Sequence, residues 1–205
     1  MKLIDLSQPI KSGMPVYPGD SEVKLEQSRK FNIDGYNNHS ISTQMHIGTH
    51  LDGRMHMLEV DEYIGNKPLE SFFGSGGIIH AENEELIRMK PGYLEIIREK
   101  EIILLNTGMA KRYGTEEYYL AHPVLDMDFC KYLAENKVKL VGFDLPSPDR
   151  YPFEVHKFLF KNNIMILENL TNLDKLSNTD EFEICAFPLK LEADSSMTRA
   201  VAIIR

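Results

Sequence analysis

The alternation of apolar and polar residues divides the chain into a strand-rich first third and a middle in which strands and helices alternate. Residues 40, 42 and 44 are polar whereas 41 and 45 are apolar, which is the period of a half-buried strand. The same reasoning, with turn residues as boundaries, assigns the other elements. Strands are predicted at residues 23–31, 39–46, 76–80, 102–105, 139–143, 164–167 and 200–204, and helices at 93–100, 126–135 and 153–162.

The alternation of strands and helices in the middle of the chain predicts a parallel βαβ core. The 205 residues suffice for one domain with a full core, and no linker, repeat or low-complexity segment divides them. We therefore expect a single α/β domain over residues 1–205 with a mixed, partly parallel sheet. Ligands of such sheets bind beyond the carboxyl ends of the strands, where Asn106, Asp144 and Glu168 are expected.

Composition limits the partners and the compartment. Hydrophobic residues make up 42% and charged residues 26%, as in ordinary soluble domains. A net charge of −8 disfavours nucleic acid and anionic membrane as main partners. Asp5 interrupts the apolar run that a signal peptide needs, and no stretch approaches the ~18–20 apolar residues of a membrane span. Cys130 and Cys185 lack metal-binding spacing and are expected to be buried thiols, so the predicted location is cytoplasmic.

The segment from His46 to His56 carries the most informative chemistry. Three of the seven histidines and one aspartate fall within these eleven residues. Imidazole and carboxylate are ligands that zinc and manganese accept. His50 and Asp52 are two residues apart, so on extended backbone they point to one side. A bend at Gly48 can bring His46, expected at the end of a strand, round to meet them. We therefore expect these three side chains to bind a divalent metal.

Two later residues can complete the site. Glu168 directly follows the apolar run 164–167, and a carboxylate at the end of a buried strand is costly unless it is paired or bound to a metal. His156 lies twelve residues earlier, in the first turn of a predicted helix. The sequence allows the two to converge without requiring it. Alone, His156 is also typical of an exposed helix position, and Glu168 of a structural, cap-like role.

Taken together, these motifs resemble those of the cyclase-like metal-dependent hydrolases, a family that includes bacterial kynurenine formamidase and isatin hydrolase. The resemblance covers nearly the whole chain and is most specific at His46-x-Gly-Thr-His50-x-Asp52-x-x-x-His56. The segments that also carry it are residues 4–10, 14–20, 105–108, 141–149 and 199–202, together with His156 and Glu168.

The resemblance implies a swivelling β/α/β fold with two metal ions. His46, His50 and Asp52 would bind one ion. Asp52 would bridge to a second ion held by His156, and Glu168 would contribute to both. Zinc is the expected metal, with manganese as the alternative. The family's usual assembly implies a homodimer or homotetramer.

Three nearby residues concern the substrate. The resemblance implies that His56 is the general acid/base and that Tyr17 lines the substrate pocket. The residues alone leave His56 open to two other roles, a further metal ligand or a packed core histidine. Arg54 stands where the family normally has proline. Its guanidinium either faces solvent or contacts an anionic group of the substrate, so it is a candidate substrate-binding residue.

These features predict a metal-dependent hydrolase that cleaves the C–N bond of a small amide or cyclic amide, as an arylformamidase does. Metal-activated water would attack the carbonyl, and His56 would protonate the leaving nitrogen. A covalent acyl-enzyme is disfavoured because the sequence lacks a Gly-x-Ser-x-Gly elbow. The alternatives are an isatin- or lactone-type ring hydrolase using manganese, and a non-catalytic member that binds a metal or small molecule. All candidate ligand positions are filled, which favours an enzyme.

Overall fold

A nine-stranded mixed sheet forms the centre of the computed structural model, which describes residues 1–179 and 181–205. The strand order is β1-β13-β11-β5-β7-β9-β10-β4-β12. The four middle strands run parallel, and they are β5 (Phe73–His80), β7 (Ile102–Asn106), β9 (Leu140–Phe143) and β10 (Met165–Glu168). The antiparallel flanks are β1 (Lys2–Asp5), β13 (Val201–Ile204), β11 (Phe182–Cys185), β4 (His50–Asp52) and β12 (Ser195–Met197). The predicted mixed, partly parallel α/β sheet is thus confirmed.

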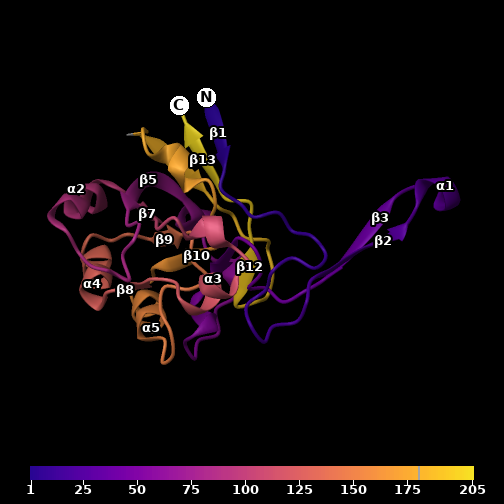
Figure 1. Cartoon of the computed structure of the whole chain (residues 1–205), viewed down its shortest axis with the longest axis horizontal. Coiled ribbons are helices and arrows are strands. Elements are labelled where there is room, and N and C mark those ends of the chain that lie inside the picture. Colours follow the sequence, from indigo (N-terminus) through magenta and orange to yellow (C-terminus); the bar gives the residue numbers. More distant parts are fainter. Residues whose placement is uncertain (180) are drawn as a thin grey trace.

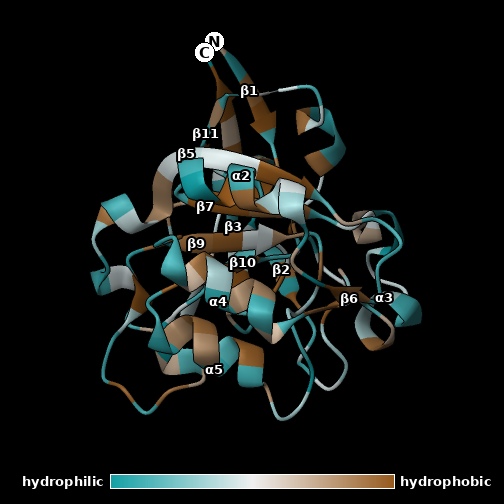
Figure 2. Cartoon of the chain, turned by 90° about the vertical axis from the view of Figure 1, so that its left-hand side faces the viewer, coloured by the Kyte–Doolittle hydropathy of each residue, from teal (hydrophilic) through white to brown (hydrophobic). Residues whose placement is uncertain are grey.

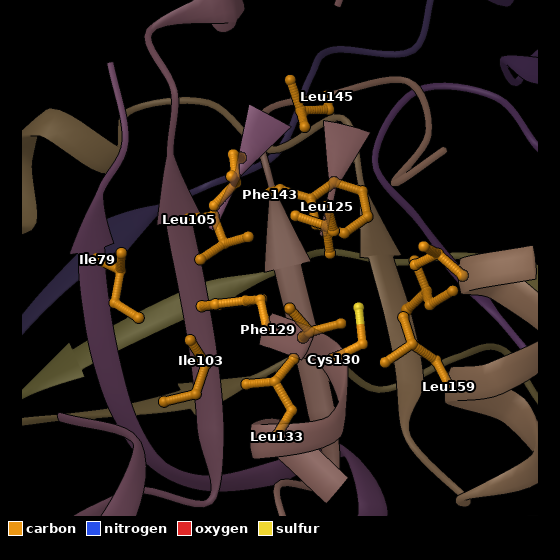
Figure 3. Close-up of a cluster of buried hydrophobic side chains, with 14 of the residues drawn as sticks. Ile79, Ile103, Leu105, Leu125, Phe129, Cys130, Leu133, Phe143, Leu145 and Leu159 are labelled. Carbon is orange, nitrogen blue, oxygen red and sulfur yellow. The ribbon is translucent and has the colours of Figure 1, made fainter. Parts of the chain in front are cut away.

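Three crossover helices cover one face of the sheet, as Figure 2 shows. They are α2 (Pro91–Glu99), α4 (Met127–Glu135) and α5 (Glu154–Lys161). Proline stands at the first position of α2, where its missing N–H is harmless, and the Asp126 carboxylate caps α4 by accepting from the N–H of Asp128. Their apolar stripes meet the β-branched and leucine side chains of the sheet in one continuous core (Figure 3).

The opposite face of the sheet carries a second core, to which the central strands, the flanking strands and their connecting segments all contribute. Buried side chains of this second core come from both edges and the centre, including Leu6, Leu51, Leu104 and Ile184. Because the central strands are covered on both faces, they read as continuous apolar runs rather than as alternating ones. Strands β1 and β13 pair antiparallel, so the two chain termini lie side by side (Figure 1).

Several short elements surround the sheet. Strand β6 (Leu86–Ile87) pairs with β8 (Val124–Leu125), and α3 (Glu116–Leu120) lies between them in sequence. The 3₁₀ helices are η1 (Arg54–His56), η2 (Ile64–Asn66), η3 (Leu69–Phe72), η4 (Met109–Arg112) and η5 (Leu173–Leu176). Within the described residues, no helix combines the length and the apolar character needed to cross a membrane.

The first two long strands of the chain leave the main sheet altogether. Strand β2 (Lys24–Arg29) and β3 (Asn38–Ser42) pair only with each other, and the one-turn helix α1 (Phe31–Asp34) joins them. The resulting two-stranded arm projects far from the rest of the molecule (Figure 1). The two strands were predicted correctly, but β3 ends at Ser42, so His46 lies in the following loop and not at a strand end.

The two cysteines differ in their surroundings. Cys130 is buried in α4, and this burial raises the pKa of its thiol. Cys185 is only half-buried at the end of β11, which corrects the expectation that both are buried. Neither forms a disulfide.

Candidate active site

Strand β4 and the turn before it bring three of the predicted ligands together. His50 and Asp52 lie two residues apart on this short buried strand and face the same side. Gly48 has a φ of +54°, which permits the bend that returns His46 toward them. His46 Nδ1 lies 2.9 Å from Asp52 Oδ1, and His50 Nε2 lies 3.3 Å from the same oxygen. The structure therefore brings these three side chains together at the turn, as the spacing predicted.

The neighbouring strand β10 adds Glu168, and helix α5 adds His156. Glu168 is the last residue of β10 and stands opposite His50 in the antiparallel register. One carboxylate oxygen, Oε2, lies 3.4 Å from His50 Nε2, and the other, Oε1, lies 3.6 Å from His156 Nε2. The helix start and the strand end thus converge on one site, as the sequence allowed.

The five side chains form a row in which imidazoles and carboxylates alternate, in the order His46, Asp52, His50, Glu168, His156. Three of their atoms are fully buried and lack a hydrogen-bond partner among the described residues, namely His50 Nε2, Asp52 Oδ1 and Glu168 Oε1. Unpaired buried polar atoms are costly, and these three belong to side chains that meet in one site. His50, Asp52 and Glu168 each offer a ligand atom within 4.8 Å of the others, as do His46, Asp52 and His56. The donor set therefore fits a divalent metal.

Both deeply buried histidines are fixed through their other ring nitrogen. His50 Nδ1 donates to the carbonyl of Gly48 at 2.9 Å, and His156 Nδ1 donates to Asp149 Oδ1 at 2.5 Å. The second oxygen of Asp149 accepts from the first backbone N–H groups of α5, so this carboxylate fixes the helix start and the ring together. Such bonds set the tautomer that leaves Nε2 free for a metal.

His56 lies on the mouth side of the site beside a carboxylate that the sequence reasoning missed. Asp194 Oδ2 lies 3.3 Å from His56 Nδ1 and 2.7 Å from His46 Nε2. Asp194 lies 148 residues from His46 in the chain, so no local spacing in the sequence pointed to it. Its position beside β12, which pairs with β4, is what brings it into the site.

These contacts shift the pKa values of the paired groups in opposite directions. Burial opposes charging of His46, but the Asp52 and Asp194 carboxylates outweigh it and raise its pKa to about 11. Burial likewise opposes charging of His156, yet bonds to Asp149 and Glu168 raise its pKa to about 9. The hydrogen bonds from His46 and His56 hold the pKa of Asp194 well below its usual range. In the metal-free protein, protonated histidines therefore pair with the carboxylates and stabilise the site.

A cavity of about 590 Å³ opens over these residues. All six side chains from His46 to Glu168 that were predicted as ligands or acid/base line it, together with Asp194. The lining also includes the aromatic side chains Tyr17, Tyr113, Tyr119 and Phe153, and Phe153 packs edge-on against His156 with ring centroids 5.8 Å apart. Tyr17 packs edge-on against Tyr119 with ring centroids 5.8 Å apart. Tyr17 therefore lines this cavity, at the place that the resemblance implied.

Two other candidate positions lie outside the cavity lining. Arg54 Nη1 donates to Glu62 Oε2 at 3.0 Å, and Glu62 also pairs with Lys67, so the guanidinium is engaged away from the cavity. Of the two roles considered for Arg54, this ion pair supports neither directly, and contact with a substrate stays a prediction. Asp144 accepts from Thr107 and from the backbone of the next turn, which makes it a brace between two strand ends.

Relatives of known name match the chain along its whole length. The family model described as "Putative cyclase" matches residues 4–150. The kynurenine formamidase of Bacillus cereus is 32% identical over 203 residues, which cover 97% of this chain and 95% of the relative. The kynurenine formamidase of Bacillus anthracis is 31% identical over 205 residues, which cover 98% and 96%.

Solved structures share the fold. A predicted metal-dependent hydrolase from Bacillus stearothermophilus superposes with a TM-score of 0.78 at 25% identity, covering 100% of this chain and 98% of that one. Isatin hydrolase A from Labrenzia aggregata, bound to benzyl benzoate, gives a TM-score of 0.85 at 20% identity, with 99% and 93% covered.

Proposed function

Because this chain belongs to the cyclase family of metal-dependent hydrolases, we propose that it hydrolyses the C–N bond of an aryl formamide. The observation that carries the proposal is the cavity, in which imidazole and carboxylate ligands and a group of aromatic side chains, here called the aromatic wall, share one lining. Family membership and the ligand set account for hydrolysis, and the aromatic wall accounts for the aryl group.

The chain's own residues would hold two divalent ions, zinc in preference to manganese. Five alternating ligands exceed the four that one tetrahedral zinc accepts, and the two carboxylates lie between histidines where they could be shared. His46, His50 and Asp52 are proposed for one ion, Asp52 and His156 for the other, and Glu168 would contribute to both. When bound, such ions supply a water molecule that is nucleophilic near neutral pH and neutralise charge on the attacked carbonyl oxygen.

His56 is proposed to deliver the proton that the leaving nitrogen needs. Its ring lies in the cavity, 4.1 Å from the ring of His46 between centroids, and its Nδ1 faces Asp194. A proton held on Nδ1 by the carboxylate leaves Nε2 to exchange a proton with substrate. Asp194 accepts from His46 as well, so it also couples the acid/base to a proposed ligand. The alternative role of His56 is that of a metal ligand, because its ring nitrogen lies within 4.8 Å of ligand atoms of His46 and Asp52.

The aromatic wall favours a planar aryl group in the substrate. Burial raises the pKa of Tyr119 to about 12, so its ring stays neutral and can stack. Burial also raises the pKa of Tyr113, and Phe153 carries no charge. A formamide on an aromatic ring places its carbonyl at the ligands and its ring at this wall.

An activity assay on protein of known metal content tests the proposal. Purified protein with zinc measured by mass spectrometry is assayed on N-formylkynurenine, isatin and a simple aryl ester. We expect formate release from N-formylkynurenine to have the highest kcat/KM and to disappear after chelation and return with zinc. A metal-loaded protein that hydrolyses none of the three would contradict the proposal.

A second candidate is a ring hydrolase acting on a cyclic amide. The fold shared with isatin hydrolase A and the aromatic side chains that line the cavity favour it. Faster ring opening of isatin than deformylation in the same assay would establish this alternative.

A further inference from the structure

Asn169 joins the two segments that carry the deeply buried ligand candidates His50 and Glu168. It directly follows Glu168 at the end of β10, and it is only 7% exposed. Its φ of +57° lies in the left-handed region, which asparagine adopts more readily than most residues that have a side chain. From this position its side chain reaches the turn before β4 and contributes to the lining of the cavity.

The Asn169 amide bonds to the carbonyl group that orients His50. Its Nδ2 donates to the Gly48 carbonyl oxygen at 3.0 Å, and the same oxygen accepts from His50 Nδ1 at 2.9 Å. Because a carbonyl oxygen is only an acceptor, the atom that faces it must be the amide nitrogen, which gives the amide a single orientation. The bond from Asn169 therefore fixes the acceptor on which the tautomer and the ring angle of His50 depend.

Two further bonds fix Asn169 itself. The Tyr118 hydroxyl donates to Asn169 Oδ1 at 2.7 Å, and burial raises the pKa of this phenol, so it remains a neutral donor. The backbone carbonyl of Asn169 accepts from Thr49 Oγ1 at 2.8 Å. Tyr118 is a fully buried residue of α3 and lies outside the cavity lining. Asn169 is thus bonded both to the turn that precedes His50 and to a helix that carries no ligand candidate.

We propose that Asn169 is a positioning residue that sets the separation and orientation of His50 and Glu168 before a metal binds. Glu168 Oε2 lies 3.4 Å from His50 Nε2, and the latter atom has no hydrogen-bond partner among the described residues. A divalent ion needs such ligand atoms at ~2.0–2.2 Å, and ligands that are already in place need not be ordered on binding. This role rests on the proposed metal site, but it does not depend on which amide is hydrolysed.

Zinc titration and the visible spectrum of the cobalt-substituted protein test this role, because neither measurement depends on catalysis. Asn169→Gly removes the amide and keeps a residue that tolerates the positive φ. We expect zinc affinity to fall ~10–100-fold, the usual effect of losing a group that orients a ligand. The absorption bands of bound Co²⁺ should also shift at saturating metal, which a general loss of stability would not cause. Asn163→Gly, the same change at an exposed residue with a φ of +58°, should leave both measurements unchanged.

Tyr118→Phe tests whether the amide transmits the effect. It removes one hydroxyl group outside the cavity and should lower zinc affinity about fivefold, the scale of one hydrogen bond. Combined with Asn169→Gly it should cause no further loss, because the hydroxyl would then have no amide to hold. Tyr93→Phe removes a hydroxyl that donates to the carbonyl of His80 away from the cavity, and it should keep the native affinity.

The outcomes separate this role from the proposed reaction. Native zinc affinity and a native cobalt spectrum in Asn169→Gly would overturn the positioning role and leave the proposed hydrolysis standing. If Asn169→Gly does not fold, unchanged affinity in Tyr118→Phe would overturn it instead. Additive losses in the double variant would overturn the link through the amide. A chain that binds zinc with these variant effects but hydrolyses no amide would support the role of Asn169 and contradict the proposed function.

Discussion

The deep and mouth sides of the active site use the same residue types in different ways. On the deep side, His50 and His156 are almost fully buried, each fixed through Nδ1, with Nε2 left for a ligand. On the mouth side, the side chains of His46 and His56 are each 25% exposed and share the Asp194 carboxylate. Both ring nitrogens of His46 face carboxylates, so this histidine must give up one contact to bind a metal.

The deep side is therefore pre-organised to bind a metal, whereas the mouth side is pre-organised to hold a proton. Buried ligand atoms without partners gain most from a metal, since nothing else compensates their loss of water. On the mouth side, the Asp194 carboxylate faces two histidines and can keep a proton on either imidazole ring. The following predictions test this division.

Glu168→Gln should have the largest effect. It removes the charge that lies between the two deep histidines, and uncompensated buried charges cost about 3–5 kcal/mol, or at least ~10²-fold in metal affinity. Bound metal, measured by mass spectrometry, and activity should both be lost. Glu154→Gln, the same change at an exposed position of α5, should preserve both. Retention of metal in Glu168→Gln would refute the role of the deep side.

His56→Ala should lower turnover by ~10²–10⁴-fold while metal content is unchanged, which is the usual range for loss of a general acid/base. Metal analysis and kcat are measured on the same preparation. Loss of metal together with activity would instead identify His56 as a ligand, and unchanged turnover would remove it from the mechanism.

Metal binding should strengthen with pH. The raised pKa of His156, about 9, and of His46, about 11, mean that protons occupy these ligands in the metal-free protein near neutrality. The stability these charged histidines give the metal-free protein is present below about pH 6.5, and the His156 share is lost as pH rises through about 9. Each displaced proton makes affinity about tenfold tighter per pH unit, so the loss of one proton from each histidine gives ~10⁴-fold between about pH 6 and 8. Competition with a chelating dye measures this, and a pH-independent affinity would contradict it.

Asp149→Asn should weaken metal binding by ~10–100-fold, the usual effect of losing a carboxylate that orients a ligand histidine. Asp194→Asn is the matched change on the mouth side, and it should reduce turnover more than metal affinity. Titration with zinc and measurement of kcat at saturating zinc separate the two effects. If both variants lose metal equally, the two sides do not differ as described.

Arg54→Pro should have the smallest effect. The side chain pairs with Glu62 away from the cavity, and position 54 begins a 3₁₀ helix, where proline fits. Metal affinity and KM should each change by about twofold or less, the scale of about 0.5 kcal/mol typical of surface substitutions. Glu62→Gln breaks the same ion pair without changing the backbone. A large change in substrate preference in Arg54→Pro alone would restore the predicted substrate contact.

Local spacing predicted one half of the site because its geometry is local. His50 and Asp52 share a side of any extended segment, and Gly48 supplies the only bend needed to add His46. The role of Arg54 was harder to predict, because whether a long side chain turns to a cavity or to Glu62 depends on a neighbour eight residues away.

The sequence by itself determined the α/β class, the apolar central strands and the ligand types, since periodicity and side-chain chemistry are properties of short segments. Only the tertiary structure brought Asp194 to His46 and Glu168 to His50, because strand order decides which distant segments meet. The tertiary structure alone also separated the arm from the sheet: two strands with the right alternation can pair with each other or with a core, and their period is the same in both cases.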